Sequence, residues 1–250
     1  MTTQGWIREV TSDSILQKKR SDTIFILGSG YSINELTSSE IKRMEQHDTF
    51  SFNWFVYQNF IRIDFHLIRE IASDDWNQSV WQKELQIYSD LLKKSVHYKN
   101  TLFVLQVGWN SIRIIAHHYL PEAAEVIFYY ADRKGTRYPT TDFKLGIIHG
   151  PSTLFDSIHF AYLFGWKKIV LVGVDLYDRR YFWLKPDETR VTDVKRNKTY
   201  HDTHNTAREV VVWTKRWGKY LEKKGIELFV YNPMSLLAGA IQVFNPNERL

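Results

Sequence analysis

The sequence has no cysteine among its 250 residues. Disulfide bonds and thiolate metal sites are therefore excluded, and the absence favours a reducing compartment. No apolar run approaches the roughly 18 to 20 residues that a membrane-spanning helix needs. The first residues also lack the apolar core of a signal peptide. These absences predict a protein that stays in the cytoplasm and does not cross a membrane.

Sites for a metal ion are also scarce. The pattern Asp-x-Asp, with which many nucleotide-sugar transferases hold a divalent cation on a diphosphate, does not occur. His117 and His118 are adjacent and would point about 100° apart on a helix, so they do not easily share one metal ion. His201 and His204 are three residues apart with no third ligand nearby, which is weak evidence for zinc. The sequence predicts neither a bound metal nor a cofactor.

The composition is that of a globular protein: 44% of the residues are hydrophobic, 15% aromatic and 24% charged. The chain is long enough to bury a full core, so residues 22–250 are expected to form one domain. Residues 1–21 are mostly polar and are predicted to be an N-terminal extension in solvent. The net charge of +5 favours anionic partners such as a nucleotide sugar, acidic lipid headgroups or nucleic acid.

Apolar runs alternate with helical patterns along the chain. Residues 151–162 carry apolar side chains at helical spacing and end at Gly165, and residues 169–174 form a β-branched run typical of a strand buried on both faces. Further strands are expected at 23–27, 49–52, 61–68, 102–105, 126–130 and 226–231, and further helices at 33–45, 74–99, 111–119, after 204 and at 235–241. This alternation predicts a Rossmann-like α/β/α sandwich.

Polar residues follow several of the expected strands. Asp175 and Tyr177 come after the strand at 169–174, and ligands of open α/β sheets bind at that edge. The stretch 28–32, Gly-Ser-Gly-Tyr-Ser, joins the first strand to a helix in an arrangement typical of phosphate binding. It lacks the third glycine of the dinucleotide fingerprint and the lysine of a P-loop, so a plain tight turn is the alternative.

Residues 178–200 contain many arginines and lysines and almost no aliphatic residues, which predicts a lid near 178–204. His201 is expected in the lid, and His204 at the start of the helix that follows it. Because histidine ionises near neutral pH, either one suits a general base that removes a proton from a sugar hydroxyl. Two surface histidines are the alternative interpretation. Tyr177, Tyr181 and the arginines of the lid would stabilise a leaving phosphate.

Short motifs are spread over most of the chain in a distinctive order. They are Leu27-Gly28-Ser29-Gly30-Tyr31-Ser32, Phe52-Asn53, Gly173-Val174-Asp175-Leu176-Tyr177, Tyr181, His204-Asn205-Thr206 and Pro233-Met234-Ser235-Leu236-Leu237. In this order they resemble the bacterial sialyltransferases of glycosyltransferase family 42. The resemblance implies a single-domain variant of the GT-A fold, a CMP-activated nonulosonic acid as donor, inversion at the anomeric carbon and no metal requirement.

The resemblance also implies a role for each matching residue. It assigns binding of the nucleotide to Gly28, Ser29, Gly30 and Ser32, and binding of its phosphate or ribose to Asn53. Ser152 and Thr153 would bind the donor. Asp175 would either bind the nucleotide or shape the turn. Tyr177 and Tyr181 would hydrogen-bond the leaving phosphate, and His204 would be the general base, with His201 as the alternative. Ser29 stands where the family has Asn, and residues 149–152 read His-Gly-Pro-Ser where it has Arg-Ile-Thr-Ser. These departures bear on the choice of donor or acceptor.

The expected partners are therefore a nucleotide-sugar donor and a glycan acceptor, as in bacterial lipopolysaccharide or capsule biosynthesis, and not nucleic acid. The basic charge is compatible with a peripheral position on the anionic inner face of a membrane, and a homo-oligomer is left open. Two other functions fit the glycine turn. One is a Mg²⁺-dependent domain like a pterin pyrophosphokinase or a flagellin-modifying transferase, and the other is a non-catalytic nucleotide-binding module.

Overall fold

The computed structural model describes residues 6–69, 71, 78–132, 138–177, 180–185 and 200–246, and at residues 78 and 200–206 it describes the backbone alone. Nine parallel strands form one sheet in the order β1-β6-β5-β4-β3-β2-β7-β8-β9. The strands are β1 (Ile7–Glu9), β2 (Thr23–Leu27), β3 (Asp48–Phe52), β4 (Phe65–Ile68), β5 (Leu102–Gln106), β6 (Ala124–Tyr129), β7 (Lys168–Val172), β8 (Glu227–Val230) and β9 (Gln242–Val243).

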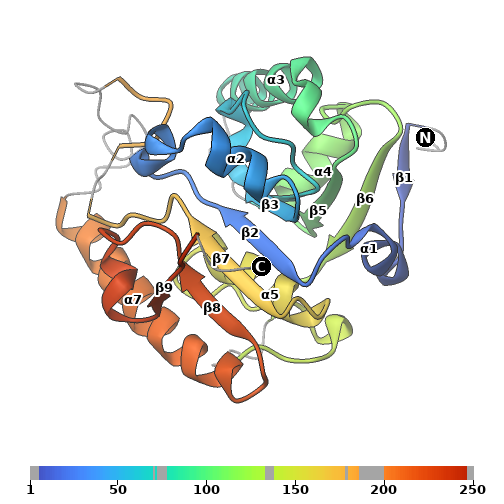
Figure 1. Cartoon of the computed structure of the whole chain (residues 1–250). Coiled ribbons are helices and arrows are strands. Elements are labelled where there is room, and N and C mark those ends of the chain that lie inside the picture. Colours follow the sequence, from blue (N-terminus) through green and yellow to red (C-terminus); the bar gives the residue numbers. More distant parts are fainter. Residues whose placement is uncertain are drawn as a thin grey trace.

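Helices cover both faces of this sheet (Figure 1). The α-helices are α1 (Ser12–Lys18), α2 (Ser38–Met44), α3 (Gln78–Lys94), α4 (Trp109–Ala116), α5 (Thr153–Leu163) and α7 (Tyr200–Glu222). Short 3-10 turns are η1 (Tyr31–Glu35), η2 (Asn53–Tyr57), η3 (Val96–Tyr98), η4 (Phe143–Leu145) and η5 (Leu236–Gly239). The predicted Rossmann-like α/β/α sandwich is confirmed by this layered arrangement.

The core is divided by the sheet into two hydrophobic clusters. Within β2, Ile24 and Ile26 belong to the cluster that includes α5 and α7, and Phe25 and Leu27 belong to the cluster that includes α3 and α4. Successive side chains of a strand point to opposite faces, so a strand that is apolar throughout serves both clusters. The β-branched and aromatic runs of the sequence therefore lie at the centre of the sheet.

The strand order reverses beside β2. From β2 the chain moves outward through β3, β4, β5 and β6, and then returns to place β7 on the other side of β2. The chain therefore leaves β2 and β7 toward opposite sides of the sheet, and open α/β sheets bind ligands at the carboxyl edge of such a reversal. This topology places the two most distinctive sequence motifs, at 28–32 and 173–177, side by side.

The two ends of the chain differ from the sequence-based expectations. The N-terminal segment is not a solvated extension: β1 pairs with β6, and Ile15 of α1 is fully buried in the core. At the other end, the expected final helix is the short turn η5 followed by β9, which pairs with β8. Elements of two or three residues carry too little periodicity to be seen in sequence, and pairing with a neighbour creates them.

Several element boundaries also differ. The helix expected at 33–45 is divided into η1 and α2, because Thr37 begins α2 with a capping box in which its hydroxyl accepts from the Glu40 N–H at 3.3 Å. The strand expected at 61–68 begins at Phe65, and the helix expected at 74–99 ends at Lys94. Pro151 precedes the N-cap of α5, which is Ser152, and is not inside the helix.

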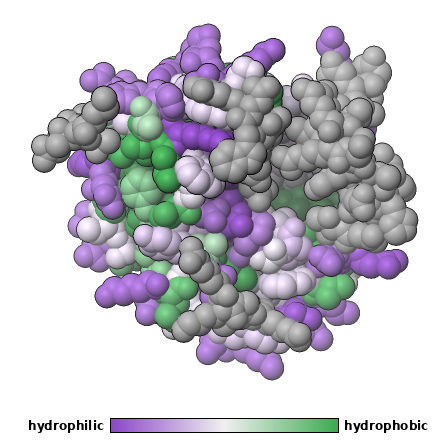
Figure 2. Space-filling view, turned by 180° about the vertical axis from the view of Figure 1, so that it is seen from behind, coloured by the Kyte–Doolittle hydropathy of each residue, from purple (hydrophilic) through white to green (hydrophobic). Residues whose placement is uncertain are grey.

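Hydrophilic side chains dominate the molecular surface seen from behind, and hydrophobic ones gather in one area at the left of the view (Figure 2). Large apolar side chains with high exposure include Trp109, Ile112 and Tyr130. In the described part of the chain, no helix is both long and apolar enough to cross a membrane.

Candidate active site

The loops after β2 and β7 are held together by backbone hydrogen bonds. The N–H of Gly28 donates to the carbonyl of Val172, and that of Gly30 donates to the carbonyl of Gly173, each at 2.7 Å. A Cβ atom on Gly28 would lie 2.6 Å from the Gly173 oxygen, and one on Gly30 would lie 2.7 Å from it. The two glycines are therefore required for the close approach of the two loops, whether or not a ligand also contacts them.

The buried side chain of Asp175 also joins these two loops. It is only 2% exposed, and its carboxylate accepts from the Ser32 N–H at 2.9 Å and from the Ser32 hydroxyl at 2.5 Å. The side-chain amide of Asn232, which follows β8, donates to it at 3.1 Å. The resemblance implies that Asp175 either binds the nucleotide or shapes the turn. These hydrogen bonds to Ser32 are contacts that shape the turn after β2. Ser32 is buried beside it.

Tyr177 lies at the exposed side of this arrangement. Its side chain is 48% exposed, and its hydroxyl accepts from the Asn232 amide at 3.3 Å. Leu176 precedes it with a φ of 65°, a left-handed conformation that non-glycine residues adopt rarely. Asn232 was not predicted as a site residue, although its position just after a strand at the same edge is a signal that could have found it.

Residues 180–185, part of the expected lid, pack against the loop after β2. Tyr181 forms an isolated antiparallel bridge with Gly30, and the N–H of Phe182 donates to the carbonyl of Ser29 at 3.1 Å. The rings of Tyr181 and Trp183 stack with centroids 4.4 Å apart, and Phe182 is buried. This part of the segment is anchored to the core and is not a separate lid. Residues 178–179 and 186–199 lie outside the described residues.

The cation of Arg180 lies 3.9 Å from the centroid of the Tyr31 ring. This contact places one of the arginines expected to stabilise a leaving phosphate beside the glycine turn. Tyr181 and Arg180 thus reach the same loop from one short segment.

The helix α7 begins earlier than expected and includes both candidate histidines. His201 and His204 lie in its first turns, so the prediction that His201 belongs to a lid ahead of the helix is wrong. Their side chains lie outside the described residues. The assignment of either histidine as a general base stays a prediction.

Asn53 was expected to bind the phosphate or ribose and Thr153 the donor, and the fold brings the two residues together across 100 residues of sequence. The Asn53 amide donates to the Thr153 hydroxyl at 3.2 Å, and its oxygen accepts from the Arg69 N–H at 3.1 Å. Asn53 itself has a φ of 48°, which an asparagine tolerates better than most residues. Ser152, the N-cap of α5, makes no side-chain capping hydrogen bond. Asn53, Ser152 and Thr153 therefore lie at one edge, close to the end of β3.

A second polar network, which the sequence analysis missed, is centred on Asp156 in the first turn of α5. This aspartate is fully buried, and its Oδ1 accepts from the Arg69 guanidinium at 3.2 Å and from the Tyr129 hydroxyl at 2.9 Å. Its Oδ2 lies 2.6 Å from Nδ1 of His149. Burial, and next the charge of Asp156, raise the pKa of Tyr129 well above its usual value. In the sequence, the signal that could have revealed this network is the single acidic residue within the apolar stretch 153–163.

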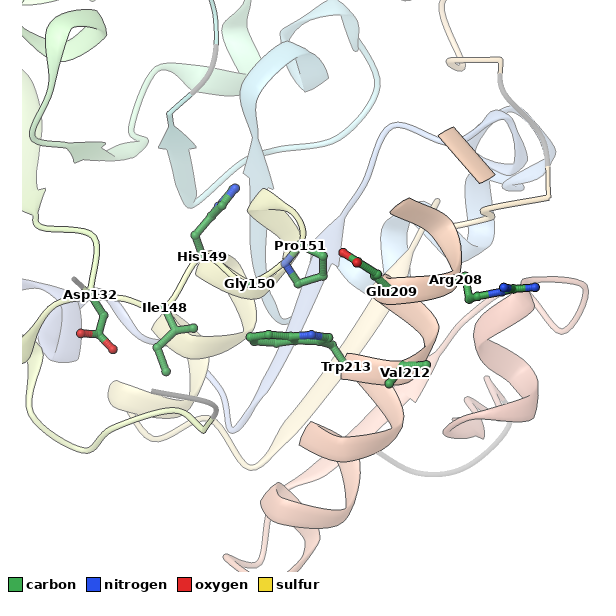
Figure 3. Close-up of a pocket in the computed structure, with 9 residues that line it drawn as sticks. All are labelled: Asp132, Ile148, His149, Gly150, Pro151, Arg208, Glu209, Val212 and Trp213. Carbon is green, nitrogen blue, oxygen red and sulfur yellow. The ribbon is translucent and has the colours of Figure 1, made fainter. Parts of the chain in front are cut away.

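Beside this network lies a cavity of about 590 Å³. His149, Gly150 and Pro151 line one side, and Arg208, Glu209 and Trp213 of α7 line the other. Figure 3 shows Trp213 beneath the loop that carries Gly150, and the Glu209 carboxylate directed toward Pro151. The cavity is therefore bordered by the helix that carries His201 and His204 and by the loop that precedes α5.

The structure is similar to those of two sialyltransferases. One is the sialyltransferase CST-II in complex with CMP, with 18% identity, a TM-score of 0.48, and coverage of 91% of this chain and 88% of the other. The second is the monofunctional alpha-2,3-sialyltransferase Cst-I from Campylobacter jejuni, with 15% identity, a TM-score of 0.49, and coverage of 96% and 84%. No protein-family model matches the chain, and no curated protein matches it.

Within the described residues, no group of three or more His, Cys, Asp or Glu side chains is placed to hold a metal ion. The polar groups at the carboxyl edge are instead backbone N–H groups, hydroxyls, amides and the two buried aspartates. Hydroxyl and amide donors of this kind can bind a phosphate and stabilise charge that develops on it.

Proposed function

We propose that the protein is a glycosyltransferase that moves sialic acid, or a related 2-keto-3-deoxy sugar acid, from a CMP-sugar to a surface glycan. The supporting observation is the convergence of the glycine turn, the Asn53–Thr153 pair and Tyr177 at the reversal of strand order. These are the positions to which the motif order assigns donor binding. The reaction would invert the anomeric carbon and need neither a metal ion nor a cofactor.

In this proposal the nucleotide occupies the loop at 28–32, Asn53 holds its phosphate or ribose, and the sugar lies toward Ser152 and Thr153. Tyr177 and Tyr181 donate hydrogen bonds to the phosphate as the bond to the sugar breaks. Charge grows on the phosphate oxygens at that moment, so donors already in place lower the barrier more than they strengthen ground-state binding.

The acceptor and the location belong to the same proposal. A glycan of a bacterial lipopolysaccharide or capsule would be modified in the cytoplasm, with the basic protein held at the anionic inner face of the membrane. Cosedimentation with vesicles that contain anionic lipid tests this: binding should weaken as salt is raised, because screening shortens the reach of the charges.

The function is tested by thermal shift with CMP, CDP, UDP, GDP and ATP, each with and without Mg²⁺. A ligand that binds only the folded state raises the melting temperature. CMP should do so without metal, and EDTA should change nothing. Stabilisation by ATP or UDP only with Mg²⁺, and none by CMP, would instead favour a kinase-like domain. Stabilisation by CMP without transfer or donor cleavage would favour a nucleotide-binding module.

A further inference from the structure

An apolar surface is exposed to solvent at the carboxyl ends of β5 and β6. We call it the α4 surface, and its members are Val107, Trp109 and Ile112 around the start of α4, Tyr130 after β6, and Leu145 in η4. Trp109 is 67% exposed, Tyr130 63% and Ile112 55%. Monomeric proteins rarely leave a large contiguous apolar patch in water, so such a surface marks a site of interaction.

Backbone hydrogen bonds hold the three segments of the α4 surface side by side. The N–H of Val107 donates to the carbonyl of Tyr129, and the N–H of Ile147 donates to the carbonyl of Tyr130, each at 2.8 Å. These two bonds place Tyr130 beside both the segment that leads into α4 and the segment that follows η4. The exposed apolar side chains therefore form one continuous surface.

The helix α4 is apolar on the side that faces solvent as well as on the side that faces the core. Ile114 is fully buried, whereas Trp109 and Ile112, which are three residues apart and share a helical face, are more than half exposed. The outer face of a surface helix normally carries polar or charged residues. A helix with apolar side chains on both sides is expected to have a partner on the outer one.

The charges at the α4 surface are mainly positive. No aspartate or glutamate occurs in the segments that carry it, which are 107–119, 129–131 and 143–148. These segments contain Arg113 and Lys144, and the ammonium of Lys93 in α3 donates to a carbonyl at the end of α4 at 2.7 Å. The aspartates that border the segments have other contacts: Asp132 lines the cavity beside α7, and Asp142 accepts from the N–H of Lys144 at 2.9 Å. A surface of apolar and cationic side chains complements anionic lipid headgroups above an acyl layer.

We propose that the α4 surface docks on an anionic lipid bilayer, with Trp109 and Ile112 in the interfacial layer and the neighbouring cations against the headgroups. Tryptophan and tyrosine suit this layer, because each combines a large apolar ring with a polar group that stays in water. A second copy of the chain fits less well. A twofold interface uses the same patch on both subunits, so Arg113 and Lys144 of both copies would be buried in one contact.

The α4 surface lies at the same edge of the sheet as the proposed donor site. Val107 and Tyr130 follow β5 and β6, and Asn53 follows β3, so all three lie at the carboxyl ends of parallel strands. The Asn110 amide of α4 donates to the carbonyl of Arg69 at 2.9 Å, and the Arg69 N–H donates to Asn53 at 3.1 Å. Docking therefore places the proposed site beside the membrane. In this part, which rests on the proposed function, the acceptor is a lipid-linked glycan.

The test is cosedimentation with vesicles of phosphatidylcholine and phosphatidylglycerol, and with vesicles of phosphatidylcholine alone. The protein should bind the anionic vesicles, and binding should weaken as salt is raised. Trp109→Ser and Ile112→Ser should each weaken binding about 10-fold, because each removes an apolar side chain that leaves water on insertion. Val96→Ser is the matched control. Val96 is 78% exposed but lies in η3 ahead of β5, at the amino edge of the sheet, so its loss should leave binding unchanged.

A second measurement locates the contact directly. Because the chain has no cysteine, a single introduced one can carry an environment-sensitive nitrobenzoxadiazole label. With anionic vesicles, the emission of the label should shift to shorter wavelength in Ile112→Cys and not in Val96→Cys. Both side chains are exposed, so neither substitution removes packing from the core.

Absence of binding to anionic vesicles would overturn the proposal, and so would equal binding by Trp109→Ser, Ile112→Ser and Val96→Ser. Sedimentation velocity without lipid gives a further contrary outcome: a wild-type dimer that Ile112→Ser dissociates would show that a second copy covers the surface. The proposed function is judged separately by the thermal shift with CMP. If CMP stabilises neither the wild type nor these variants while vesicle binding is as expected, docking stands and the transferase proposal fails.

Discussion

Two buried aspartates lie at the same edge of the sheet, and their surroundings differ in kind. Asp175 is 2% exposed and accepts hydrogen bonds from Ser32 and Asn232, which are neutral groups. Asp156 is fully buried and contacts Arg69, His149 and Tyr129, all of which titrate or carry charge. A carboxylate among neutral donors fixes loop geometry, whereas one among ionisable groups also controls where a proton resides. The first aspartate therefore shapes the crevice in which we propose that the donor binds, and the second holds charged and ionisable groups together beside it.

Among the tests of this difference between the two aspartates, Asp156→Ala is expected to lower the free energy of unfolding most. Removing one member of a buried charge network leaves the Arg69 guanidinium without its carboxylate, and such losses typically cost about 3 to 5 kcal/mol. Urea denaturation should show a decrease of this size in the free energy of unfolding. Asp22→Ala is the matched control: its side chain is 74% exposed, so the change should stay within about 0.5 kcal/mol. Equal effects of the two substitutions would contradict a charged hub at Asp156.

The binding crevice is examined by Tyr177→Phe and Tyr181→Phe. Each removes a hydroxyl proposed to face the leaving phosphate, and loss of such a donor typically lowers turnover on the order of 10²- to 10³-fold. Stability should barely change for Tyr177→Phe, because the ring is 48% exposed. Steady-state kinetics should show the loss in kcat more than in KM. Small shifts in melting temperature with normal turnover would make both tyrosines structural.

The two aspartates are contrasted directly by the same isosteric change at each position, Asp175→Asn and Asp156→Asn. Asp175→Asn replaces a carboxylate oxygen that accepts from Ser32 or Asn232 with an NH₂ donor, at a cost of about 1 to 3 kcal/mol. Asp156→Asn also removes the negative charge that faces the Arg69 guanidinium, so urea denaturation should show a larger loss of stability for it. Equal losses in the two variants would show that the two aspartates do not differ in the way proposed.

The last expected effect is a local response to acid near α5. Burial lowers the pKa of His159 from 6.5 to about 4, and its Nδ1 accepts from the Ile148 N–H at 2.9 Å. The unfolded chain binds a proton at this histidine below about pH 6.5 and the folded chain does not, so stability falls as the pH drops from about 6.5 toward 4. Hydrogen exchange, corrected for its intrinsic pH dependence, should show loss of protection at Ile148 before Gly28 and Gly30. His159→Gln should remove this difference, and simultaneous loss at all three amides would contradict it.

The fold was predictable from the sequence to the extent that it depends on local pattern. The apolar run of β7, the helical face of α5 and the glycine turn after β2 are continuous segments, and their periodicity identifies them without any partner. The alternation of such segments restricts the topology to a parallel sheet covered by helices. The short strands β1 and β9 could not be predicted, because pairing with β6 and β8 creates them.

The candidate site was predictable only in part. Gly28, Asn53 and Asp175 were identified because they follow strands, whereas Thr153 was identified only through the family resemblance. The fold does bring these residues to one edge of the sheet. Asn232 was missed, since its importance comes from a contact with Asp175 that is 57 residues away in sequence. Asp156 was missed because an acid in an apolar helix shows neither its burial nor its three partners.

The sequence by itself determined the central strands and the main helices, their order and the polar residues at their ends, because these depend on side chains that are neighbours along the chain. The tertiary structure alone decided which of those polar residues meet. Ser32 reaches Asp175 across 143 residues and Arg69 reaches Asp156 across 87. Hydrogen-bond partners at such separations are selected by the register and order of the strands, which no local periodicity specifies.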